Sequence, residues 1–163
     1  MSDEVRKAPL FWLAARVVVG ALTPSGVIFV LDITLGQASA SETLLSLAHR
    51  QFAGGDNLFL LAVLGLVPFV LLDGVLLVVR SRSTEPRRVA WLAVGGTLGA
   101  LALMIPAHVG VWLPLYMHQH TSATAAVAFL FIPFFCCGSM LIGAGVAALM
   151  WRWLGRWARA DIR

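Results

Sequence analysis

Four long apolar segments dominate the sequence, and each is long enough to cross a lipid bilayer as a helix. The hydrocarbon core of a bilayer is about 30 Å thick, which takes about 20 apolar residues in helical form. The segments cover about residues 11–35, 58–79, 89–117 and 123–151. They are continuous, unlike the alternating strands of a membrane barrel, and a helix satisfies its own backbone in lipid. The pattern predicts an all-α integral membrane protein, a four-transmembrane-helix bundle forming one membrane domain over residues 1–163.

A fifth, shorter helix is predicted between the first two spans, at about residues 41–53. Ser39 and Glu42 have the spacing of a capping box, which starts a helix. One face of that helix then carries the apolar residues Leu44, Leu45, Ala48 and Phe52. We expect a short amphipathic helix on the external membrane face, and a polar loop is the alternative. Ala38-Ser39-Ala40 also matches a signal-peptide cleavage pattern, but the apolar region before it is long for a signal sequence.

The composition supports a membrane location, and the basic residues predict the orientation. The chain is 60% hydrophobic and 12% charged, with a mean hydropathy of +0.87, whereas soluble domains are about half apolar and a quarter charged. Lys and Arg accumulate on the cytoplasmic side of membrane proteins. Eleven of the 12 basic residues flank one side of the predicted spans, and Arg50 lies on the other. We therefore expect a multi-pass cell-membrane protein, of a bacterial inner membrane, with both termini cytoplasmic and no nucleic-acid partner.

The basic C-terminal tail, residues 152–163, has a helical pattern. Its arginines recur at spacings of four, three and four, so they share one helical face, and tryptophans suited to the headgroup region lie among them. The residues are Arg152, Arg156, Arg159, Arg163, Trp153 and Trp157. A simple anchor at the membrane surface is one interpretation, and binding of anionic lipid headgroups or of an acidic partner is the other.

Four ionisable residues inside the spans are candidate functional groups, because such groups are costly in lipid. Arg16 and Asp73 lie at similar depths from the inner ends of spans one and two, so they are predicted to form an ion pair. Asp32 and His108 lie in the outer halves of spans one and three, where they are predicted to share a proton or a hydrogen bond. Either pair has a structural role or belongs to a proton or ion pathway.

The external loop before the fourth span offers metal ligands in His118, His120 and Met117, whose N and S donors suit copper or zinc. Histidines two residues apart do not share a helical face, so they need an extended turn to bind one ion; polar loop residues are the other interpretation. Cys136 and Cys137 are adjacent at mid-membrane, where they are interpreted as small packing residues. No second histidine matches the depth of His108, so haem is not expected, and we predict no cofactor.

Prolines and small residues predict how the spans pack. Each span contains one proline well inside it: Pro24, Pro68, Pro106 and Pro133. Spans two and four share the fragments "VPFVLLDG" and "IPFFCCG", which hint at a parallel two-plus-two repeat. Small residues in spans three and four predict close packing between those spans, with a homo-oligomer seam as the alternative; they are Gly95, Gly99, Ser139, Gly143 and Ala147.

The sequence contains no nucleotide-binding loop, catalytic triad or zinc-protease motif. Small size and short loops favour a non-enzymatic accessory, assembly or regulatory subunit of a membrane complex. The alternative is a small oligomeric transporter or channel that uses Asp32, His108 and Asp73 in a proline-kinked bundle. A membrane enzyme that acts on lipid ranks third. The expected partners are the lipid bilayer, anionic headgroups, and another membrane protein or a second copy of the chain.

Overall fold

The computed structural model describes residues 3–51, 58–83, 85–117 and 124–160, and every regular element in them is a helix. The helices are α1 (Asp3–Thr34), α2 (Ala40–Arg50), α3 (Leu58–Arg82), α4 (Pro86–Tyr116) and α5 (Thr124–Ala160). The all-α prediction is confirmed for this part of the chain.

Four of these helices are long and apolar enough to cross a membrane, as the sequence predicted. Their apolar stretches are Trp12–Thr34, Leu58–Arg82, Pro86–Tyr116 and Val127–Leu154. At one end, each of these helices extends three to nine residues beyond its predicted span, because polar residues next to an apolar run can continue the helix. At the start of α4, for example, Pro86 occupies the first turn, where its missing N–H costs nothing.

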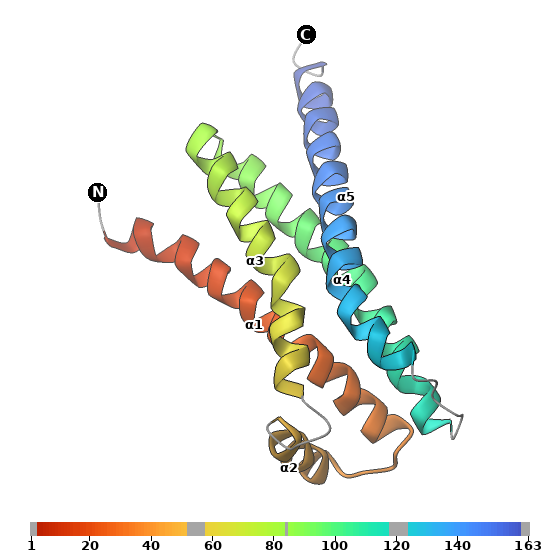
Figure 1. Ribbon diagram of the computed structural model, residues 1–163. Coiled ribbons are helices and arrows are strands. Elements are labelled where there is room, and N and C mark those ends of the chain that lie inside the picture. Colours follow the sequence, from red (N-terminus) through yellow and green to blue (C-terminus); the bar gives the residue numbers. More distant parts are fainter. Residues whose placement is uncertain (1–2, 52–57, 84, 118–123, 161–163) are drawn as a thin grey trace.

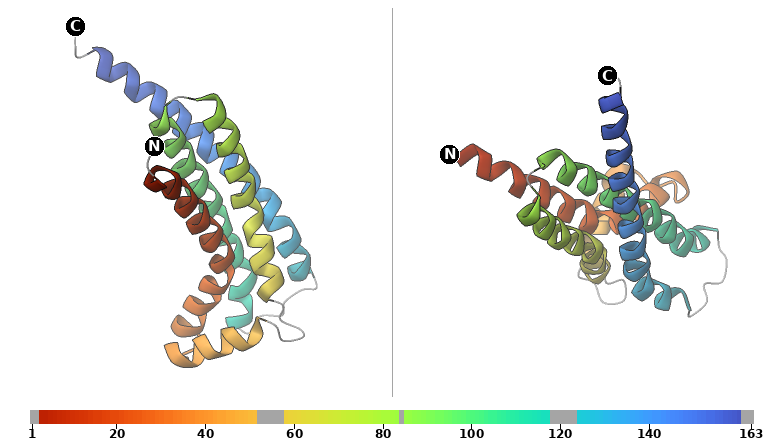
Figure 2. Two further views of the ribbon diagram at one scale, coloured as in Figure 1. Left: turned by 90° about the vertical axis from the view of Figure 1, so that its left-hand side faces the viewer. Right: turned by 90° about the horizontal axis from the view of Figure 1, so that it is seen from above.

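The start of α1, the end of α3, the start of α4 and the end of α5 lie toward one end of the bundle, and α2 lies at the opposite end (Figures 1 and 2). The C-terminus of α4 and the N-terminus of α5 also lie at the α2 end (Figure 1). The most extensive helix contact is between α4 and α5, and the second most extensive is between α1 and α3. The bundle is therefore built from two antiparallel pairs, which we call the α1–α3 pair and the α4–α5 pair.

The α4–α5 pair is packed through the small residues that the sequence singled out. A Cβ atom added at Gly99 would lie 2.5 Å from the carbonyl oxygen of Ser139 and 3.1 Å from Cα of Gly143. A Cβ at Gly95 would collide with the Cβ of Ala147 and with the carbonyl of Gly143. The Ser139 hydroxyl also donates a 2.7 Å hydrogen bond to the carbonyl of Gly99. The predicted packing of spans three and four is confirmed, and it lies within one chain.

The α1–α3 pair has its own glycine contact, which the sequence analysis did not identify. A Cβ at Gly65 would lie 2.6 Å from the carbonyl oxygen of Gly20, and a Cβ at Gly20 would lie 2.9 Å from the carbonyl oxygen of Gly65. Phe69 lies against Gly20 as well and is fully buried. The two backbones thus cross in direct contact, as small residues permit in membrane helices.

Two clusters of apolar side chains form the core of the bundle. One cluster, which includes Phe69, Met104 and Cys136, joins α3, α4 and α5, and we call it the inner cluster. The other includes Ile28, Leu47 and Trp112 and joins α1, α2, α3 and α4, and we call it the outer cluster. Cys136 is fully buried in the inner cluster, and Cys137 is half-buried with a free thiol. Their interpretation as packing residues agrees with this placement.

The short helix α2 begins with the predicted capping box. Ser39 accepts from the backbone N–H of Glu42, and the Glu42 carboxylate accepts from the backbone N–H and the hydroxyl of Ser39. Thr43 and Leu47 are buried against the bundle, whereas Leu44 and Leu45 are 59% and 78% exposed. The helix therefore keeps an uncovered apolar face after it has packed on the spans.

Candidate functional site

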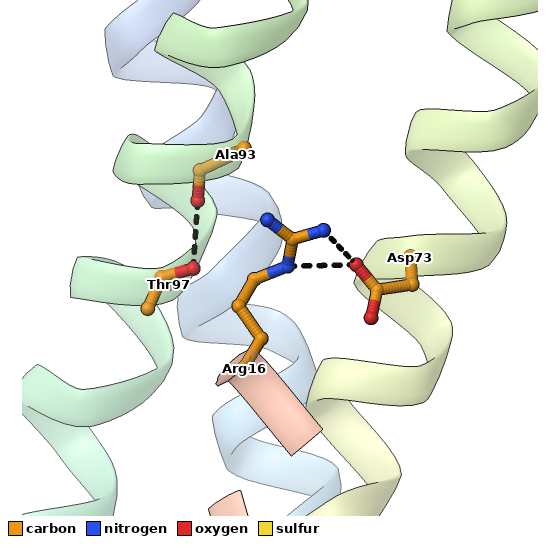
Figure 3. Close-up of polar contacts among 4 residues, drawn as sticks. All are labelled: Arg16, Asp73, Ala93 and Thr97. Carbon is orange, nitrogen blue, oxygen red and sulfur yellow. Dashed lines mark hydrogen bonds and ion pairs between the residues drawn. The ribbon is translucent and has the colours of Figure 1, made fainter. Parts of the chain in front are cut away.

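The predicted ion pair between Arg16 and Asp73 is present, and it joins α1 to α3. Arg16 Nε donates a 2.7 Å hydrogen bond to Asp73 Oδ1, and a terminal nitrogen of the same guanidinium contacts the same oxygen. The side chains are 15% and 6% exposed. Figure 3 shows Arg16 reaching from α1 toward Asp73, on the side of the bundle where α4 carries Thr97. The Thr97 hydroxyl is bonded to the α4 carbonyl of Ala93 at 2.7 Å, so it serves its own helix.

The Asp73 carboxylate has a second oxygen, Oδ2, that takes no part in the ion pair. Asp73 Oδ2 is buried and has no hydrogen-bond partner among the described residues. Burying a charged pair costs desolvation energy that is offset only when the remaining polar atoms are also satisfied. The ion pair between Arg16 and Asp73 therefore costs desolvation energy where α1 contacts α3. Ionisable groups inside a membrane are functional candidates for that reason.

The structure places Asp32 beside Tyr116, not beside His108. The Tyr116 hydroxyl donates a 2.5 Å hydrogen bond to Asp32 Oδ1. The predicted contact between Asp32 and His108 is absent from the hydrogen bonds of the described residues, and the reason is depth. Asp32 lies near the end of α1 and Tyr116 ends α4, whereas His108 precedes Tyr116 by eight residues, or about 12 Å of helix. Placing both residues in the outer half of a span was too coarse to pair them.

Two further polar contacts join α2 to its neighbours. The Arg50 guanidinium of α2 lies 6.0 Å from the centroid of the Trp112 ring, which is within the range of a cation–π interaction. Gln51 donates from Nε2 to the Ser25 hydroxyl at 3.2 Å. These contacts tie α2 to α1 and α4.

His108 lies nearer the middle of α4 than Tyr116 does, and only 3% of its surface is exposed. Its ring lies 5.8 Å from the ring of Phe129, and its Nδ1 atom has no hydrogen-bond partner among the described residues. Trp112 lies one turn closer to the C-terminus of α4, and its ring centroid is 5.5 Å from that of the same Phe129. Its Nε1 atom is also buried and has no hydrogen-bond partner among the described residues. Buried polar atoms without partners are rare and are commonly satisfied by bound water.

A regular spacing on α4 underlies this arrangement. The buried residues of α4 recur every fourth position: Gly96, Ala100, Met104, His108 and Trp112. Tyr116 continues the series at its outer end. The first three members are small or apolar and the last three carry a polar group, so the stripe changes character at His108. The sequence analysis noted His108 alone, and the four-residue spacing of His108, Trp112 and Tyr116 was the signal that would have linked them.

A small cavity adjoins His108 between α3, α4 and α5. Its lining includes Leu64 and Gly65 of α3, Met104 and His108 of α4, and Phe129 of α5. About 10 Å³ of it is open to the centre of a water molecule, which is room for one water. The cavity is therefore too small for an organic substrate.

The metal candidates fall largely outside the described residues. Met117 is described and is an exposed residue at the end of α4, but His118 and His120 lie outside the described part of the chain. Within that part, no group of three or more His, Cys, Asp or Glu side chains is placed to hold a metal ion.

The C-terminal candidates lie on the last turns of α5, which extend past the rest of the bundle (Figure 1). Arg152 and Trp153 are exposed, and the Trp151 ring lies 6.4 Å from that of Trp91, which joins α5 to the start of α4. Arg156, Trp157 and Arg159 continue the helix, and Arg163 lies outside the described residues.

Comparison with protein-family models, with curated proteins and with solved structures gives no match to this chain.

Proposed function

We propose that this chain is a multi-pass protein of a bacterial inner membrane with both termini in the cytoplasm and α2 on the external membrane face. The arginine distribution supports this orientation, because eleven of 12 basic residues flank the spans on one side. The start of α1, the end of α3, the start of α4 and the end of α5 lie toward one end of the bundle, which fits this orientation (Figure 1). The exposed apolar side chains of Leu44 and Leu45 suit contact with lipid at the membrane surface.

Cysteine labelling tests this topology. In a chain whose two native cysteines are replaced by alanine, an impermeant thiol reagent added outside intact cells should label Ser46→Cys on α2. The same reagent should label Glu85→Cys, before α4, only after the cells are opened. Both positions are exposed in the isolated chain, so the difference reports the membrane. The reverse pattern would overturn the orientation.

Within the membrane, we propose a non-enzymatic role as an accessory, assembly or regulatory subunit that docks through α5. The observation that carries this proposal is a pair of glycines, Gly138 and Gly145, seven residues apart on the exposed face of α5. A Cβ atom added at either one would meet no atom of another helix within 4 Å. The neighbouring Phe134, Leu141 and Ile142 side chains are 72%, 57% and 70% exposed. Two glycines flanked by large apolar side chains make a shallow depression into which a second helix packs closely.

Purification in a mild detergent tests the docking role. The proposal expects a second membrane protein to co-purify in fixed stoichiometry. The double variant Gly138→Leu, Gly145→Leu should release that protein while the chain itself stays folded. Gly110→Leu on α4 is the matched control, because Gly110 is equally open but lies on another helix. Co-purification that survives the double variant, or that the control abolishes equally, would overturn the docking face.

A small oligomeric transporter or channel is the second candidate, and a different observation favours it. Polar groups lie on both sides of the apolar core: Arg16 with Asp73 in one half, and Asp32 with Tyr116 in the other, with His108 between them. This candidate expects a symmetric homo-oligomer on purification. It also expects flux across liposomes that His108→Ala abolishes without unfolding the protein.

A further inference from the structure

The cavity beside His108 lies where two proline-containing helices face each other. Pro68 of α3 and Pro133 of α5 are both buried, and Pro133 is part of the cavity wall. A proline inside a helix has no N–H to donate, so the carbonyl four residues earlier loses its usual partner. For Pro68 that carbonyl belongs to Leu64, and for Pro133 it belongs to Phe129. Both of these residues line the cavity.

Three residues around this space therefore carry a polar group that lacks its usual partner. They are His108, whose Nδ1 has no hydrogen-bond partner among the described residues, and Leu64 and Phe129, whose backbone carbonyls face a proline that has no N–H to donate. A neutral imidazole carries its proton on one of its two nitrogens, so Nδ1 can donate, whereas a carbonyl oxygen accepts. Leaving such groups without partners in a membrane costs free energy, and a small molecule that both accepts and donates removes that cost.

We propose that this cavity is a binding site for a single water molecule, which bonds to His108 Nδ1 and to the carbonyls released by the two prolines. The volume admits one water. With the imidazole proton on Nδ1, the water oxygen accepts from Nδ1–H, and the two O–H groups of the water donate to the two carbonyls. The site goes beyond the docking role proposed above, because it lies inside the bundle and not on the exposed face of α5. It links α3, α4 and α5 at the level where each helix has an unfilled hydrogen bond.

The apolar remainder of the wall explains why the ligand is water and not a larger or charged species. Met104 and Ile132 are 0% and 7% exposed and belong to the inner core cluster. Within the described residues, no carboxylate lines the cavity, so it offers no counter-charge to a metal cation. An acyl chain would fill such a space without satisfying the three polar groups.

Water-edited solid-state NMR of the ¹⁵N-histidine protein in liposomes tests the site. Magnetisation transferred from water should reach the His108 imidazole in spite of its burial, and the Nδ1 shift should be that of a hydrogen-bonded nitrogen. The His108→Gln variant assigns the signal among the four histidines of the chain. A wild-type His108 signal that receives no water magnetisation would overturn the proposal.

Proline variants test the carbonyls. Pro68→Ala and Pro133→Ala each return an N–H to the carbonyl of Leu64 or Phe129, so each should reduce the water transfer to His108. Pro106→Ala is the matched control, because Pro106 is exposed on α4 and the carbonyl it releases belongs to Ala102, which is not part of the cavity wall. Transfer that is unchanged in both Pro68→Ala and Pro133→Ala, or reduced as strongly by Pro106→Ala, would show that the released carbonyls do not hold the water. For any variant that does not fold, the wild-type measurement still decides the proposal.

Discussion

The α4–α5 pair and the α1–α3 pair have the same antiparallel form but are held together differently. The α4–α5 pair is joined by a row of small residues and one serine-to-carbonyl hydrogen bond. The α1–α3 pair has a single glycine crossing, at Gly20 and Gly65, and adds a buried ion pair. Where two helices pack along a long seam, dispersion contacts suffice. Where they only cross, as α1 and α3 do (Figure 1), a strong polar contact holds the diverging parts.

The same comparison separates the functional candidates. Among the candidate residues inside the spans, the three charged ones belong to α1 and α3: Arg16, Asp32 and Asp73. In the α4–α5 pair, α5 carries Gly138 and Gly145, the glycines of the proposed docking face, on its exposed side. The charged candidates therefore lie in the α1–α3 pair, and α4 adds His108 and Tyr116 to the polar groups of the bundle.

Breaking the small-residue seam should give the largest effect. In Gly143→Ala the new methyl group meets the backbone of Gly95 and Gly99, which cannot move aside as a flexible side chain does. We expect a loss of about 3 kcal/mol in unfolding free energy, at the upper end for an overpacked site, measured by unfolding in mixed micelles. Gly138→Ala on the same helix meets nothing within 4 Å and should be neutral or stabilising by up to about 1 kcal/mol. Equal losses for both variants would show that the seam is not special.

Removing one charge of the ion pair comes second. Losing one member of a buried pair costs about 3–5 kcal/mol in protein interiors. Because Arg16 has a long side chain that can move its charge toward the membrane surface, we expect a smaller loss of about 2 kcal/mol for Asp73→Asn. Adding Arg16→Gln should restore part of it, as read from the melting temperature in detergent. Strictly additive losses in the double variant would mean that the two side chains are not coupled.

The contact between the two pairs at the α2 end should be weaker. Tyr116→Phe removes the hydrogen bond to Asp32 and should cost about 1 kcal/mol, because both residues are only half-buried. The same substitution in an Asp32→Ala background should cost nothing further. A full loss in that background would assign the effect to packing of the ring.

The smallest effect should be the pH dependence of α2. Hydrogen bonds from the side chain and the backbone N–H of Ser39 lower the pKa of Glu42. A carboxyl whose pKa is lowered on folding stabilises the helix above its ordinary pKa, and this contribution is lost as the pH falls through the lowered value. Amide hydrogen exchange in α2 should therefore speed up in acid relative to the spanning helices, after correction for intrinsic exchange. Glu42→Gln should remove that difference, and a difference that persists would have another source.

Much of the fold was accessible from the sequence because the bilayer imposes simple rules. Continuous apolar runs predicted the four spans, and the spacing of Ser39 and Glu42 predicted the capping box that starts α2. The pairing of Arg16 with Asp73 followed from their depths and opposite charges. The partner of Asp32 did not, because several polar groups lie in the outer half of the bundle and an error of two helical turns selects the wrong one.

The sequence by itself determined which segments are helices, where the small residues of α4 and α5 recur, and which charges lie inside the spans. Those properties depend on local hydrophobicity and helical spacing, which are fixed along one chain. Only the tertiary structure decided that Gly20 crosses Gly65, that Tyr116 contacts Asp32, and that Leu64, Phe129 and His108 line one cavity. Each of these depends on the rotation and offset of one helix against another, and those are set by packing among side chains far apart in the sequence.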